Sequence, residues 1–156
     1  MLAFASASAN SVAQVEALKE QLVGAWMLEL TSTKLPDGSD VWGSNPIGLL
    51  IFTNNGLFSS QTMRSDRPTF SSNSRVKGTP EENKAAVHGS IASFGTYTVN
   101  EPEKTVTFRY LGSTFPNREG TEETWPVLIN GDVLRITHLS TSVGGRPSHL
   151  MYHRLK

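Results

Sequence analysis

Hydrophobic and polar residues alternate along most of this chain with a period of two, the pattern of strands with one buried face. The first such segment is 22–30, where the even positions are Leu or Gly apart from Trp26. Further segments that read as strands cover residues 47–53, 57–64, 91–99, 105–111, 121–129, 133–140 and 148–155. The pattern therefore predicts eight strands.

Short turn sequences separate these strands. Asn54-Asn55-Gly56 joins the second strand to the third, and Asn130-Gly131 joins the sixth to the seventh. Asn and Gly tolerate the positive φ that tight hairpin turns require. Strands at this spacing indicate an antiparallel meander, and eight are enough to close a barrel around a core or one small ligand. We therefore expect an all-β protein, an eight-stranded antiparallel up-and-down β-barrel forming one domain over residues 12–156.

Two short helices are expected beside the strands. Apolar residues at i, i+3 and i+7 favour a helix over residues 12–22. A second helix, near residues 80–88, follows a polar loop over 65–78. Thr79 is its predicted N-cap, Pro80 occupies its first position, and Glu82 completes a capping box.

Composition limits the classes of partner. Lys plus Arg and Asp plus Glu number 14 each, so the net charge is zero and there is no basic run to favour nucleic acid. No apolar stretch approaches the ~20 residues of a membrane span. Cysteine is absent, which excludes disulfides and favours either a reducing compartment such as the cytoplasm or a barrel that is stable without disulfides. Residues 1–11 are rich in Ala and Ser without basic residues, so we expect a flexible tail rather than an export signal. The sequence leaves a homodimer open.

The Asn130-Gly131 turn predicts a strand register. If these two residues form a two-residue loop, Glu123 lies opposite His138 at the end of an apolar wall. A carboxylate that orients an imidazole can act as a general acid/base pair. The alternative is a cross-strand ion pair at the barrel rim, worth roughly 0.2–1 kcal/mol. The other pairs expected from this register are Ile129 with Asp132, Val127 with Leu134, and Trp125 with Ile136.

Large side chains at expected inward positions are candidates for ligand contact, although each could serve the core alone. Together with one arginine, the candidate ligand-binding residues are Met63, Arg64, Tyr97, Phe108, Tyr110, Trp125 and Tyr152. Arg109 or Tyr110 could polarise a ligand carbonyl, which makes Arg109 a third catalytic candidate. Arg64 and Arg67 could hold a carboxylate, and solvated positions at the rim are the alternative for all three arginines.

Common signatures of metal, nucleotide and nucleophile sites are absent. His149 and His153 fall on one strand, where four residues span about 13 Å, too far to share a metal ion. There is no Gly-x-Ser-x-Gly elbow and no Walker loop. We therefore expect no metal and no cofactor.

Several stretches resemble the lipocalin-like domain proteins of bacteria and of fungal biosynthetic clusters. The resemblance implies an eight-stranded barrel with Trp26 at its closed end and Arg154 packed over the ring, both in structural roles. Some fungal members catalyse cyclisations or isomerisations without a cofactor. This chain has Thr107-Phe108-Arg109-Tyr110 where the family would have a more histidine-rich stretch. The matching stretches are 22–26 with its Gly-x-Trp, 45–53, 63–68, 78–82, 94–97, 115–117 and 131–134.

Two functions follow as hypotheses. The first is binding of a small apolar or amphipathic metabolite in a cavity of the barrel. The alternative is a cofactor-independent isomerase or cyclase of secondary metabolism, acting on a polyketide- or terpenoid-like intermediate through Glu123 and His138. A structural or interaction module is a third class, and no exposed apolar edge strand marks it.

Overall fold

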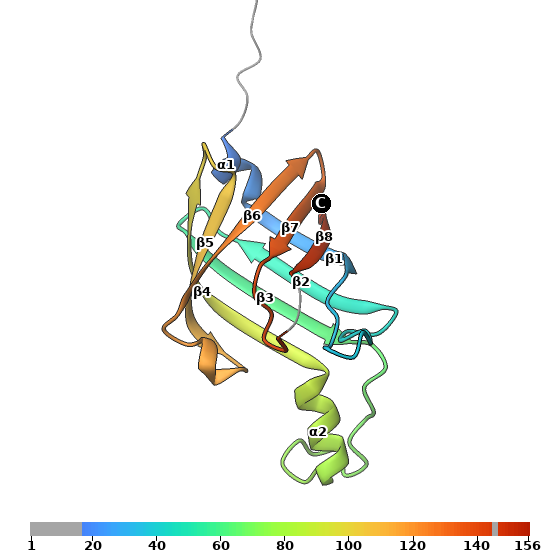
Figure 1. The fold of residues 1–156 in the computed structure, drawn as a ribbon. Helices are drawn as coiled ribbons and strands as arrows, with labels where there is room; N and C mark the ends of the chain where they lie inside the picture. Colours follow the sequence, from blue (N-terminus) through green and yellow to red (C-terminus); the bar gives the residue numbers. More distant parts are fainter. Residues whose placement is uncertain (1–16, 145–146) are drawn as a thin grey trace, which may run out of the picture.

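A computed structural model describes residues 17–144 and 147–156, and the strands of this part close into one barrel (Figure 1). Neighbouring strands pair antiparallel in chain order, and β1 pairs with β8 to complete the ring. The predicted eight-stranded all-β barrel is confirmed. The strands are β1 Gly24–Thr31, β2 Pro46–Phe52, β3 Leu57–Arg64, β4 Ser90–Asn100, β5 Thr105–Ser113, β6 Glu122–Asn130, β7 Val133–His138 and β8 Ser148–Arg154.

Both expected helices have a counterpart. Helix α1 covers Leu18–Leu22, while the expected tail over 1–11 and residues 12–16 of the expected helix lie outside the described residues. Helix α2 covers Pro80–His88. Its capping box is formed as predicted, because Thr79 Oγ1 accepts from Glu82 N at 3.2 Å and Glu82 Oε2 accepts from Thr79 N at 2.9 Å.

The predicted register of β6 and β7 is wrong by two residues. Asn130 pairs with Val133, so the loop consists of Gly131 and Asp132. Only Gly131 of these two has a positive φ, +58°, as in a type II′ turn, which needs Gly at its first central position alone. Side chains alternate with a period of two, so a shift of two residues keeps every side chain on its expected face.

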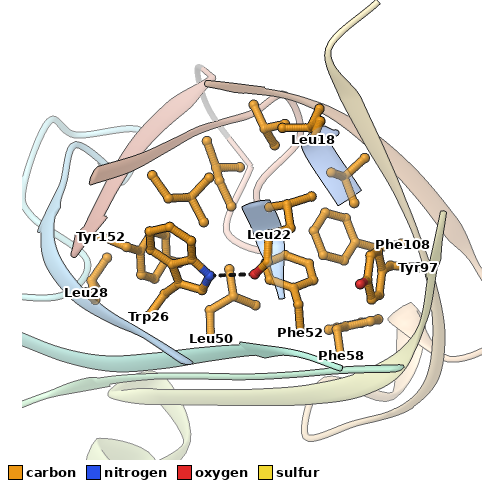
Figure 2. Close-up of a cluster of buried hydrophobic side chains, with 14 of the residues drawn as sticks. Leu18, Leu22, Trp26, Leu28, Leu50, Phe52, Phe58, Tyr97, Phe108 and Tyr152 are labelled. Atoms are coloured by element: carbon orange, nitrogen blue, oxygen red, sulfur yellow. Dashed lines mark hydrogen bonds between the residues drawn. The ribbon is translucent and has the colours of Figure 1, made fainter. Parts of the chain in front are cut away.

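One end of the barrel is closed by α1. Leu18 and Leu22 are buried, and the Trp26 indole Nε1 donates to the Leu22 carbonyl at 2.8 Å (Figure 2). The Arg154 guanidinium lies 4.1 Å from the centre of the Trp26 ring and donates to the Val23 carbonyl. A cation over an indole face stabilises both groups. This arrangement matches the structural roles that the resemblance implies for Trp26 and Arg154.

Aromatic side chains fill the half of the barrel next to α1. Phe52 packs edge-on against Tyr97, with ring centres 4.9 Å apart, and Phe58 packs in the same way on Phe108. The Tyr97 hydroxyl donates to the Thr53 carbonyl at 2.9 Å. These rings pack the interior of the barrel next to α1, and we expect a site inside the barrel towards the opposite end.

The opposite end carries α2 and the longer connections between strands (Figure 1). The β1–β2 connection buries Val41 and Trp42 there, and its Val41 carbonyl accepts from Arg64 Nη1 at 3.1 Å. We call this end the mouth. Within the described part of the chain, no helix is long and apolar enough to cross a membrane.

Candidate functional site

A pocket of about 650 Å³ opens at the mouth, between the β1–β2 connection, α2 and the ends of several strands. Three of its apolar side chains are well exposed, at 37% for Leu35, 71% for Val87 and 37% for Phe115. Arg64 and Arg67 also line it. Pockets for small ligands have volumes of about 300–1,000 Å³, so this one has the size of a binding site.

Two smaller hollows continue inward from this pocket. The outer hollow measures about 60 Å³ and shares Trp42 and Ile91 with the mouth pocket. The inner one measures about 40 Å³ and shares Trp125 and Tyr152 with the outer hollow. A water needs roughly 10–15 Å³ of such volume, so each hollow has room for a few waters or a small chemical group. The three spaces are therefore neighbours, and they decrease in size from the mouth towards the polar side chains described next.

Four polar side chains meet on the inner wall. The Glu123 carboxylate lies 3.5 Å from His138 Nε2 and 3.6 Å from Arg118 Nε, and it accepts from the Tyr110 hydroxyl at 3.2 Å. Arg118 Nη2 lies 3.2 Å from His138 Nε2. We call these four residues the inner polar cluster; the Trp125 ring packs against the His138 ring at 4.0 Å.

Different elements bring these residues together. Tyr110 lies on β5, Glu123 on β6 and His138 at the end of β7. Arg118 ends a short 3₁₀ turn, η1 (Pro116–Arg118), in the β5–β6 connection, and this turn directs it back into the barrel. Its guanidinium lies 4.9 Å from the centre of the Tyr110 ring, and the residue is only 8% exposed.

Burial and the neighbouring charges set the protonation states of the cluster. Burial opposes ionisation of Glu123, but contacts with His138, Arg118 and Tyr110 outweigh it and lower the pKa of the carboxyl. Burial also lowers the pKa of His138, more strongly than Glu123 raises it. Burial raises the pKa of Tyr110. At neutral pH the cluster thus holds one cation, one anion, a neutral imidazole and a neutral phenol.

Some buried polar groups around the hollows have no hydrogen-bond partner within the described residues. The Tyr152 hydroxyl belongs to a residue that is 4% exposed, and burial raises its pKa. Thr62 is 6% exposed, and the Trp125 indole nitrogen is fully shielded without a partner. Of these three groups only the Trp125 nitrogen is shielded completely, so it alone carries the cost of about 1–3 kcal/mol of an unsatisfied buried polar group. The two hydroxyls are unpaired and border the outer hollow.

The structure brings Glu123 and His138 together as the sequence analysis expected. The predicted register was wrong by two residues, which leaves both side chains on the inner face of the sheet, so they still meet. The ring that packs on His138 is that of Trp125. Phe108, Tyr110, Trp125 and Tyr152 line the inner hollow, as expected for inward positions. Their roles in ligand binding, and those of the catalytic pair, stay predictions.

Other candidates lie away from the cluster. Arg109 points outward, with a side chain 64% exposed and 3.9 Å from Glu122, because Phe108 and Tyr110 on either side of it point inward. Met63 also occupies an outward-pointing position of β3, where its sulfur contacts Arg67. Arg109 therefore cannot polarise a carbonyl inside the barrel, and the expectation that Met63 points inward is corrected.

Two more candidates are placed at opposite ends. Tyr97 belongs to the filled half next to α1, bonded to the Thr53 carbonyl. Arg64 lines the mouth, where Asp66 pairs with it at 2.6 Å. Sequence reasoning missed Arg118 altogether, since Pro116-Asn117 predicted only a turn there. Arg118 lies in a connection between strands, and hydrophobic periodicity gives no information about whether a side chain in such a connection points into the barrel.

Comparison with known proteins agrees with the fold. A family model described as a lipocalin-like domain matches residues 23–148. No curated protein matches the sequence. Among solved structures, a fatty acid transporter designated REP1-NXSQ aligns over 88% of this chain and 98% of its own, with 11% sequence identity and a TM-score of 0.40. At this distance the transporter indicates nothing about what this chain binds. The family match covers most of the barrel, and the chain belongs to the lipocalin-like domain family.

Proposed function

We propose that this barrel binds a small amphipathic metabolite at its mouth. The observation that carries the proposal is the pocket of about 650 Å³, which has exposed apolar walls and shares lining residues with the outer hollow, beside Arg118 and His138 of the inner polar cluster. Burying apolar ligand surface contributes about 25 cal/mol per Å². The apolar part of the ligand would lie in the mouth pocket, since the hollows hold only a few atoms.

Binding of the neutral dye Nile red tests this proposal. The dye fluoresces in apolar surroundings, so we expect emission to rise on addition of the protein. Val87→Asp should weaken binding several-fold, because it places a charge on the apolar wall of the pocket. Val87 is 71% exposed and α2 has no buried residue, so the fold should tolerate the change.

Val76→Asp is the matched control. Val76 is 80% exposed and does not line the pocket. Equal loss of dye binding in both variants, or no binding by the wild type, would refute a site at the mouth. Native mass spectrometry of protein from its own host, followed by organic extraction, would then identify the metabolite.

A second candidate function is cofactor-independent isomerisation or cyclisation, favoured by the contact between Glu123 and His138. A carboxylate or neutral imidazole can take a proton from a carbon beside a carbonyl, and Arg118 could stabilise the resulting oxyanion. Deuterium exchange into the bound metabolite in D₂O would measure this. Exchange that is unchanged in the double variant Glu123→Gln, His138→Ala would exclude these residues as its source.

A further inference from the structure

We propose that the inner hollows receive an uncharged, hydrogen-bonding head group of the ligand, such as a carbonyl, amide or hydroxyl group, and exclude a carboxylate. This inference rests on the proposed function, because it assigns one end of the ligand bound at the mouth. It names a chemical class that neither the pocket size nor the family match specifies.

The first argument is the charge of the inner polar cluster. Arg118 is its only cation at neutral pH, and its Nε already faces the Glu123 carboxylate at 3.6 Å. Burial keeps His138 neutral. Glu123 does not line the hollows itself, but it lies against Arg118 and His138, which do. A ligand carboxylate there would therefore meet a cation that already faces one anion. Like charges at short range in a poorly solvated site repel each other strongly.

The second argument is the set of unpaired hydroxyl groups. Tyr152 and Thr62 both line the outer hollow, both are more than nine-tenths buried, and neither makes a hydrogen bond within the described residues. A hydroxyl both donates and accepts, so the pair suits an oxygen or nitrogen of an uncharged head group. The volume of about 60 Å³ admits such a group and no long chain. The two unpaired hydroxyls are thus available to bond a ligand that enters the outer hollow.

The mouth offers a competing place for a negative head group. Arg67 lines the pocket there and makes no ion pair within the described residues; its donors meet the Arg64 carbonyl and the Met63 sulfur. A carboxylate held by Arg67 would leave the hollows to water. The inference requires that the head group pass this arginine and enter the hollows.

Displacement of Nile red by matched ligands tests the inference. Decan-1-ol, decanamide and decanoate share one chain length and differ in head group, and the acid is ionised at about pH 8. We expect the alcohol and the amide to displace the dye at concentrations about tenfold or more below decanoate. In Glu123→Gln, which removes the anion, decanoate should gain at least several-fold.

Two variants remove the hydroxyls and leave the shape unchanged. Tyr152→Phe and Thr62→Val should each weaken the uncharged ligands by roughly three- to tenfold, the effect of one lost hydrogen bond. Neither hydroxyl is paired, so the melting temperature should hold or rise. A structural role for these groups would instead lower it. Tyr97→Phe is the matched control, because its hydroxyl bonds Thr53 in the filled half and should not affect ligand affinity.

Each remaining outcome decides against the inference. Decanoate binding as tightly as the alcohol would overturn it, and loss of that binding in Arg67→Gln would place the head group at the mouth. Unchanged affinities in both hydroxyl variants would also overturn it. Dye binding that none of the three ligands displaces would reject the head-group site while leaving the apolar pocket in place. Absence of dye binding in the wild type would reject the proposed function itself.

Discussion

Replacing Arg118 by Met tests whether the inner polar cluster is held together by its one buried cation. The Arg118 side chain is 9% exposed and the Glu123 side chain 21%. The variant removes the contacts to Glu123 and His138 and leaves the carboxylate partly buried without a counter-charge. Losing one partner of a fully buried ion pair costs about 3–5 kcal/mol.

The remaining exposure of Glu123 places the expected loss below that range. We expect the free energy of unfolding to fall by about 2–3 kcal/mol, which for a chain of this size lowers the melting temperature by roughly 4–12 °C. Urea unfolding followed by circular dichroism measures the first quantity. It also shows whether the transition stays cooperative.

A double-mutant cycle separates the ion pair from simple loss of packing. Glu123→Gln removes the stranded charge, so the double variant with Arg118→Met should recover at least half of the loss. The reasoning fails if Arg118→Met costs less than about 0.5 kcal/mol. It also fails if the two single losses simply add, because additivity would mean that the charges do not interact.

Three further outcomes are expected. Burial lowers the pKa of His138 in the folded protein, so the unfolded chain binds the proton more readily, and the stability is complete above about pH 6.5 and falls as the pH drops towards the folded pKa. The variant His138→Asn should therefore reduce the change in melting temperature between about pH 6.5 and 5. An unchanged slope of melting temperature against pH would contradict this assignment. Arg154→Met removes the cation over Trp26 and two hydrogen bonds to backbone carbonyls at α1. Chemical denaturation should therefore show that the free energy of unfolding falls by about 2–4 kcal/mol. A fall of less than about 1 kcal/mol would argue against this closure of the barrel. Thr79→Ala removes the cap of α2 at a local cost of about 1 kcal/mol, so amide exchange in that helix should quicken while the global melting temperature stays nearly constant, since α2 buries no residue.

Local sequence accounts for much of the fold. Strand positions follow from period-two alternation, and the capping box at Thr79 follows from residues three positions apart. The exact hairpin between β6 and β7 did not follow, because Asn130-Gly131 and Gly131-Asp132 are both acceptable turn pairs and the choice between them depends on the pairing of whole strands. Parity was still preserved, which is why Glu123 and His138 meet despite the wrong register.

The alternation of side chains along a strand also determines the direction of Arg109. Phe108 and Tyr110 were expected to point inward, and a residue between two inward positions of a strand must point outward. Arg109 could therefore have been placed outside from the sequence alone. Met63 differs, because strand 57–64 has apolar residues on both faces, Leu57 with Met63 and Phe58 opposite, and only the burial of Thr62 shows that Met63 points outward.

By itself, the sequence determined the strands and the sidedness of most of them, since these depend on residues close together in the chain, while the closed end over Trp26 came from the resemblance to a family. Only the tertiary structure decided where ligand-sized space remains. Aromatic side chains from separate strands fill the half next to α1, and the connections at the mouth enclose the pocket. It also decided that Arg118 completes the inner polar cluster, because a connection without hydrophobic periodicity turns back into the barrel there. Contacts of that kind depend on how distant segments fold over one another, and no local pattern encodes them.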